Sequence, residues 1–176
     1  KVHYIKNDGV YKINNINFGL TTITAKKVTQ IENKNPDELY IGLYHGQMYK
    51  SKSDCDYEFK DEHLFKTSDF KDYDIVMLGD IHKFQYLNKD KTIAYSSSLI
   101  QQNFGETINN HGFIKWNLNT KKGEFFQVPN DYVFKTFHIE NMNDYTIPDN
   151  ENKKTRLKLY YNHSKKEDIK KYIIYF

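Results

Sequence analysis

The chain has 176 residues, of which 38% are hydrophobic and 16% aromatic, enough for the core of one ordinary domain. Its formal net charge of +3 is too small to indicate nucleic-acid binding by itself. The single cysteine, Cys55, excludes an internal disulfide, and no apolar run approaches the roughly 18 residues of a membrane span. We therefore expect a protein without a membrane segment in a reducing, intracellular compartment, cytoplasmic or nuclear.

Short apolar segments follow one another along most of the chain. Their patterning predicts strands at residues 2–5, 10–13, 16–20, 39–44, 75–78, 84–87, 92–95, 112–118, 124–128, 132–138 and 155–161. Asn14-Asn15 and residues 119–123 predict turns between neighbouring strands. This pattern predicts a β-rich fold.

Helical signals are few. Residues 62–66 predict a helical turn, and Ser68 predicts the cap of a second turn that carries Phe70 and Tyr73 inward. The tail, residues 164–176, begins with a capping box and continues with apolar residues at helical spacing, which predicts a helix.

Two of the apolar strands lead directly into side chains that bind metals. Residues 39–44 precede His45, and residues 75–78 precede a glycine, Asp80 and His82. Strands that end at one rim of a sheet bring such side chains together, and residues two apart in an extended segment point the same way. Imidazole and carboxylate ligands suit Mn, Fe or Zn. Structural roles stay open, in which Asp80 caps a turn, His82 bonds a backbone carbonyl and His45 is a satisfied strand-end histidine.

A longer pattern resembles the calcineurin-like metallophosphoesterases. The segments LYHG, DYDIVMLGDIHK, IAYSSSLIQQNFGE and HGFIKWNL are most similar to the SbcD-like DNA-repair nucleases and their phage and large-virus relatives. The resemblance implies an α/β, β-rich fold. Residues 1–128 would form the C-terminal half of a metallophosphoesterase β-sandwich with flanking helices, and residues 129–176 the start of an α+β capping domain.

The same resemblance implies a partial set of metal ligands. His45 matches a histidine that binds the second metal, and His82 matches the second histidine of a G-H-x-H element, which binds the first metal. Asp80 stands where the first histidine of that element is usual, and as a hard, negative ligand it favours Mn or Mg. Two divalent cations are expected, with Mn favoured and Mg, Fe or Zn as alternatives.

The serine-rich segment also departs from the family pattern. Ser97 replaces the glycine of the usual YSGS sequence. Ser96 and Ser98 are candidates either to position a phosphate or to hold the turn. His111 is expected to lie at the entry to a strand rather than to bind a metal.

The resemblance covers only the second half of the family's motifs. In the family's first half, a D-x-H element is followed by a G-D-x-x-D motif and then by a G-N-H-[DE] motif. This series does not occur in the chain, which begins with Lys1. We therefore expect the catalytic residues and the remaining ligands upstream, and we expect this chain alone to be inactive on phosphodiesters.

The favoured prediction is a metal-dependent phosphodiesterase or DNA nuclease, of the exonuclease type found in DNA repair. DNA, an SbcC-like ATPase and a second copy of the chain are the expected partners. Two alternatives stay open: a phosphatase of small or protein phosphoesters, and a non-catalytic, β-rich scaffold. The upstream sequence would discriminate between an enzyme and a scaffold.

Overall fold

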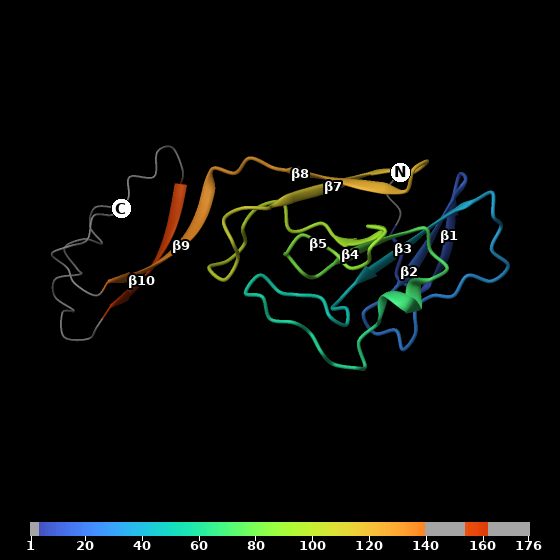
Figure 1. The fold of residues 1–176 in the computed structure, drawn as a ribbon, viewed down its shortest axis with the longest axis horizontal. Helices are drawn as coiled ribbons and strands as arrows, with labels where there is room; N and C mark the ends of the chain where they lie inside the picture. Colours follow the sequence, from blue (N-terminus) through green and yellow to red (C-terminus); the bar gives the residue numbers. More distant parts are fainter. Residues whose placement is uncertain (1–3, 140–153, 162–176) are drawn as a thin grey trace.

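The computed structural model describes residues 4–139 and 154–161, and a six-stranded sheet forms the centre of this part of the chain (Figure 1). In chain order the strands are β1 (Gly9–Ile13), β2 (Ile16–Thr21), β3 (Leu39–His45), β4 (Ile75–Gly79), β5 (Gln85–Tyr86), β6 (Ile93–Tyr95), β7 (Gly112–Asn117), β8 (Lys122–Gln127), β9 (Tyr132–Ile139) and β10 (Lys154–Tyr161). Each lies within a few residues of a strand that hydrophobic patterning predicts. The β-rich prediction is confirmed.

The central sheet has the strand order β1-β2-β3-β4-β6-β5. Strands β2, β3, β4 and β6 run parallel, while β1 and β5 are antiparallel edges. Asn14-Asn15 makes the predicted tight turn, since Ile13 pairs with Ile16 across it. Because β3 and β4 are adjacent and parallel, their carboxyl ends lie at the same rim of the sheet.

The helical predictions fare less well. Within the described ranges the only helix is the 3-10 helix η1 (Thr67–Phe70), so the flanking helices of the α/β prediction are not found there. Residues 62–66 form a turn that is not helical. Residues 4 and 5 of the first predicted strand are not in a strand, and the predicted tail helix lies outside the described residues. In the described part, no helix has the length and apolarity needed to cross a membrane.

The sequence predicted Ser68 as the cap of this short helix, but Ser68 lies inside the helix. The Asp69 carboxylate instead accepts a hydrogen bond of 2.7 Å from the Lys66 N–H. The helix nevertheless carries Phe70 and Tyr73 inward as predicted, and both are buried against the sheet. Gly19 makes room for the Tyr73 ring, because a Cβ there would overlap the Tyr73 hydroxyl.

The hairpin of β7 and β8 forms a second layer beside the central sheet (Figure 1). Phe125 of β8 stacks on Phe84 with 4.2 Å between the ring centroids, and Gly123 O accepts a hydrogen bond from Tyr86 Oη at 2.8 Å. Strands β9 and β10 form a separate parallel pair at the end of the molecule drawn on the left of Figure 1. The predicted boundary after residue 128 falls between β8 and β9 and stays a prediction.

Asp74, immediately before β4, joins the two layers. Its Oδ2 accepts a hydrogen bond of 2.9 Å from the Tyr40 N–H, and its Oδ1 lies 2.8 Å from Lys121 Nζ and 3.5 Å from Lys34 Nζ. Burial acts to raise the pKa of this carboxyl, but the hydrogen bonds from Lys121 and Tyr40 and the two lysine charges outweigh it and hold the pKa below its usual range. The ionised carboxylate therefore stabilises the folded chain.

We expect Asp74→Asn to lower the free energy of unfolding by about 1–2 kcal/mol at pH 7, where the parent carboxylate is fully charged. Because the folded-state pKa is depressed, this stabilisation is present above the unfolded pKa of about 3.9 and is lost as the pH falls through the folded value. Urea denaturation at pH 7 and at pH 3 measures the difference. A difference that is as large at pH 3 as at pH 7 would contradict the assignment.

Candidate metal centre

His45 and Asp80 meet at the rim where β3 and β4 end. His45 is the last residue of β3 and pairs with Gly79, the last residue of β4. Its Nε2 lies 3.9 Å from Asp80 Oδ1, and both side chains are exposed to solvent. A Cβ at position 79 would lie 2.6 Å from His45 Nδ1, so the glycine before Asp80 makes room for the histidine ring.

The backbone at Asp80 is strained. Its φ of 92° lies in the left-handed region, which a residue with a side chain adopts at a cost of about 1–3 kcal/mol. The chain therefore turns sharply at the end of β4 and places the carboxylate beside His45. Such strain persists where the surrounding structure imposes it, and it is frequent at functional sites.

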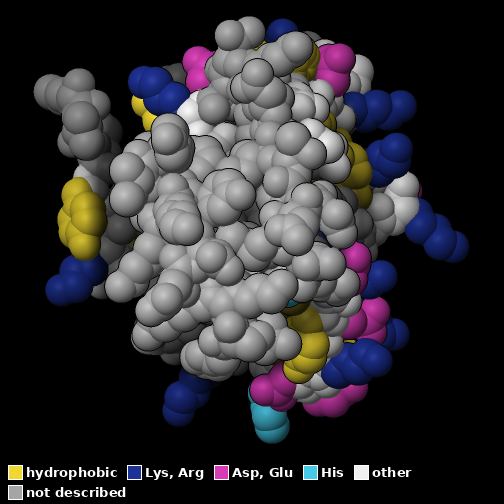
Figure 2. Space-filling view, turned by 90° about the vertical axis from the view of Figure 1, so that its left-hand side faces the viewer, with side chains coloured by type: hydrophobic (Ala, Val, Ile, Leu, Met, Phe, Trp, Pro, Cys, Tyr) yellow, Lys and Arg dark blue, Asp and Glu magenta, His cyan; other side chains and the backbone are white. Residues whose placement is uncertain are grey.

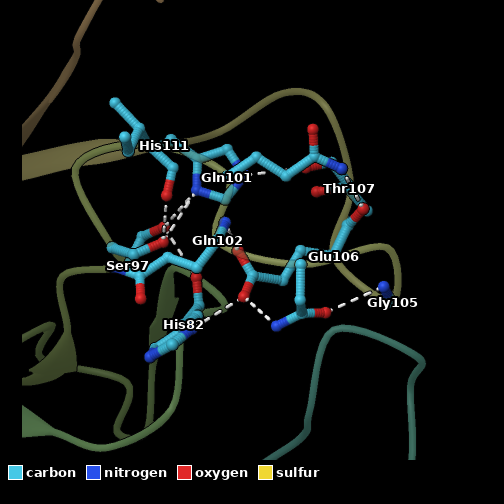
Figure 3. A network of polar contacts seen from close by, with 11 residues as sticks. His82, Ser97, Gln101, Gln102, Gly105, Glu106, Thr107 and His111 are labelled. Atoms are coloured by element: carbon cyan, nitrogen blue, oxygen red, sulfur yellow. Dashed lines mark hydrogen bonds and ion pairs between the residues drawn. The ribbon is translucent and has the colours of Figure 1, made fainter. Parts of the chain in front are cut away.

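His82 lies two residues further on, and Glu106 holds its ring (Figure 3). The His82 Nδ1 is 2.8 Å from Glu106 Oε1, and the Glu106 side chain is only 3% exposed, against 37% for His82. The structural alternative had His82 bonding a backbone carbonyl, but in the structure the ring bonds a carboxylate. Glu106 belongs to the NFGE segment that carried the family resemblance, yet nothing in its spacing predicts this contact.

Asp80 and His82 line one pocket of about 330 Å³. Three ionisable residues that the sequence did not single out as site residues share its lining: Asp54, Cys55 and Glu106. Burial first, and then the Glu106 charge, raises the pKa of Asp54. A hydrogen bond from Ser53 lowers the pKa of Cys55.

The three predicted ligands do not surround one common point. Asp80 contacts His45 and also shares the pocket with His82. Among the described residues, no three or more His, Cys, Asp or Glu side chains come together in a group that could hold a metal ion. Any cation bound at this rim therefore requires further ligands beyond these side chains.

The serine segment, residues 96–98, is hydrogen-bonded to the backbone of the site. Ser97 has a φ of 77°, and its Oγ donates a 2.6 Å hydrogen bond to His82 O. The Ser98 Oγ, which is buried, donates to Ile100 O and also lies 3.0 Å from His111 Nδ1. Ser96 Oγ bonds the Ser97 carbonyl at 3.3 Å. These contacts favour the turn-holding alternative for both candidate serines.

His111 lies directly before β7, at the strand entry. Its ring is buried, and its Nε2 lies 2.7 Å from Thr107 O (Figure 3). The Ser98 contact joins the two ends of the loop formed by residues 97–111, and the Thr107 bond holds its last residues.

No family model matches the chain. The chain is similar to a protein of Acanthamoeba polyphaga mimivirus that is described as uncharacterized, with 46% identity over 145 residues. The match covers 77% of this chain but 11% of the viral protein, so the chain spans about a ninth of that relative's length. The similarity relates the chain to a segment of a much longer protein and assigns it no activity.

The conformation of Ser97 yields a stability prediction. Ser97→Gly removes the cost of the left-handed conformation, about 1–2 kcal/mol, but it also removes a hydrogen bond of similar value. The free energy of unfolding of this variant should therefore lie within about 1 kcal/mol of the parent value. Ser97→Ala loses the bond and keeps the strain, so it should be less stable than the glycine variant by about 1–2 kcal/mol. Urea denaturation compares the two, and equal stability would refute the reasoning.

Proposed function

We propose that the chain is part of a metal-dependent phosphodiesterase, a nuclease, in which His45, Asp80 and His82 bind two divalent cations. The observation that carries the proposal is the convergence at one rim, where His45 lies 3.9 Å from Asp80 beside the pocket that His82 shares. In this proposal residues 1–128 are the second half of a metallophosphoesterase sandwich, and residues 129–176 begin its cap.

The donor set fits such cations. Histidine nitrogens and a carboxylate suit Mn, Fe or Zn, and the Asp80 carboxylate favours the harder Mn and Mg. Three side chains are too few for two cations, so the proposal requires further ligands, which the family resemblance places upstream of these 176 residues. The match to a ninth of a longer viral protein is compatible with that requirement.

Two bound divalent cations would supply a water of lowered pKa and would neutralise the charge that develops on the phosphorus oxygens. The proposed role of the chain's own residues is to hold the cations in place. His45 and Asp80 offer two donors from the ends of two adjacent strands, and the Asp80 charge offsets part of a cation's charge. None of the three is proposed to move a proton.

A row of cations and aromatic rings on β9 and β10 favours a nucleic acid over a small phosphoester. Alternate residues of paired strands share one face, and this face carries Tyr132, Phe134, Thr136, His138, Lys154, Arg156, Lys158 and Tyr160. Lys154 Nζ lies 5.3 Å from the centroid of the Tyr132 ring, and Lys158 Nζ lies 4.9 Å from that of Tyr160. Tyr132 is 51% exposed and Tyr160 46%. Bases stack on such rings while cations bind the backbone phosphates.

This face is connected to the pocket. Phe104 packs edge-on against Phe134 of β9 with 5.0 Å between the centroids, while its neighbours Asn103 and Gly105 line the pocket with His82. A single nucleic-acid strand bound across β9 and β10 would therefore extend toward the proposed metal ions. Figure 2 views the molecule from the side of these strands, and Lys and Arg side chains, with carboxylates among them, are visible around the edge of the view.

The phosphatase and scaffold alternatives stay open, and so do the SbcC-like ATPase and the homodimer as partners. A phosphatase of small substrates needs no extended stacking surface, and a scaffold needs no metal. Cleavage of DNA by the natural full-length protein, dependent on added Mn²⁺, is the experiment that separates the nuclease from both. The 176-residue chain alone should be inactive, and Mn-dependent cleavage by it would contradict the proposed need for further ligands.

Asp80→Asn should weaken Mn²⁺ binding by the full-length protein and remove most of its activity, because it deletes the charge of a metal ligand. The loss should be at least the 10–100-fold that removal of an outer-shell partner costs. Asp80→His should restore activity and raise the tolerance of Zn relative to Mn. Mn²⁺ titration measures the affinities, with Asp90→Asn as the control at an exposed aspartate. Unchanged affinity in Asp80→Asn would remove Asp80 from the ligand set.

Tyr132→Ala and Tyr160→Ala should each weaken binding of a single-stranded oligonucleotide by about 1–3 kcal/mol, the value of one base–aromatic stack. Tyr4→Ala, at a tyrosine that is 88% exposed outside this face, serves as the control. Fluorescence anisotropy at several salt concentrations gives the affinities. If both face variants bind like the control, the face is not a nucleic-acid surface.

A further inference from the structure

We infer that Glu106 is a positioning residue, which holds His82 as the tautomer with hydrogen on Nδ1 and so directs the Nε2 lone pair to the pocket as a donor to a divalent cation. The metal part of this inference rests on the proposed function, whereas the tautomer does not. Figure 3 shows Glu106 and His82 within one polar network.

The other two hydrogen-bond partners of the Glu106 carboxylate are donors. Oε2 accepts from the Gln102 N–H at 2.8 Å, and Oε1 accepts from Asn103 Nδ2 at 2.5 Å. The His82 Nδ1 lies 2.8 Å from the same Oε1. An ionised carboxylate only accepts hydrogen bonds, so Nδ1 must carry the hydrogen and Nε2 must carry the lone pair of a neutral ring.

The ring has the exposure that a ligand needs. Nδ1 is turned to the buried carboxylate, and Nε2 is at the opposite end of an imidazole that is 37% exposed and lines the pocket. Carboxylates that accept from the second nitrogen of a metal-binding histidine fix its tautomer and orientation and raise its basicity. Glu106 stands in that relation to His82.

The loop by itself does not account for a charged residue at this position. The loop donors that reach the carboxylate, from Gln102 and Asn103, are both neutral, and burial of a carboxylate carries a large desolvation cost. Gln101 anchors the backbone of the same residue independently, since its Nε2 donates to Glu106 O at 2.9 Å. What the carboxylate adds is a second oxygen that only accepts, Oε1, which the His82 ring shares with Asn103 Nδ2.

The first test reads the tautomer directly, in the metal-free 176-residue chain. ¹⁵N–¹H spectra of the imidazole nitrogens, recorded well above the ordinary histidine pKa of about 6.5, distinguish the two neutral forms. His82→Gln assigns the signal. We expect a protonated Nδ1 and a bare Nε2 in the parent chain.

Glu106→Gln should weaken the preference for that tautomer. The new amide has one oxygen for donors on two sides, the Gln102 N–H on one side and Asn103 Nδ2 with His82 Nδ1 on the other. Where the oxygen faces Gln102, the amide nitrogen faces His82, so Nδ1 accepts and Nε2 is protonated. Glu106→Asp retains a carboxylate and should largely keep the parent tautomer, whereas His111→Gln disturbs the same loop without touching His82 and should leave the tautomer unchanged.

The second test uses Mn²⁺ and the full-length protein. Glu106→Gln should weaken Mn²⁺ binding about 10–100-fold, while His111→Gln should weaken it far less at equal folded fraction. A parent that has the expected tautomer but binds no Mn²⁺ would overturn the proposed function and the ligand role of Nε2, leaving the tautomer assignment in place.

Three results would overturn the inference itself. One is a parent His82 with its hydrogen on Nε2, and another is a Glu106→Gln variant in which the parent tautomer is populated as fully as in the parent. A shift of equal size in His111→Gln would also overturn it, because the effect would then belong to the loop and not to the carboxylate.

Discussion

The parallel pairing of β3 with β4 is the constraint on which the candidate site depends. Its register sets His45 opposite Gly79, so that the first residue after β4 is the one whose carboxylate can reach the imidazole. A slip of one residue would turn the side chains of one strand to the opposite face of the sheet. The buried apolar residues of both strands oppose such a slip, because they pack on the same core under Phe70.

The second half of the site depends on a polar loop. Residues 97–111 contain few apolar side chains that could anchor them, and they are held by Ser97 on His82 O, by His111 on Thr107 O, and by Glu106. No buried side-chain nitrogen or oxygen in the described part lacks a partner. A fully satisfied network of this kind holds one geometry, since the loss of any member leaves a buried polar group unpaired. The position of His82 is therefore set by residues far along the chain from the strand that precedes it.

Much of this arrangement could be predicted from the sequence, and the reasons for the exceptions are physical. Apolar periodicity located the strands, and the residues that follow them placed His45 and Asp80 at one rim. The Glu106 contact spans 24 positions and joins two irregular segments, which have no periodicity from which a partner can be derived. Asp54 and Cys55 belong to a charged loop that also lacks periodicity, so their place in the pocket lining could not be derived from the sequence either. Ser68 was predicted as a cap from its residue type, but Asp69 makes the capping bond.

We propose that one rim of the sheet binds divalent cations through His45, Asp80 and His82, and anomalous diffraction from crystals of the Mn²⁺-loaded full-length protein is the measurement to make. We expect Mn peaks within direct coordination distance of His82 Nε2 and of the Asp80 carboxylate, with His45 on the same cation as Asp80. Mn peaks elsewhere in the protein, with none at these three side chains, would contradict it.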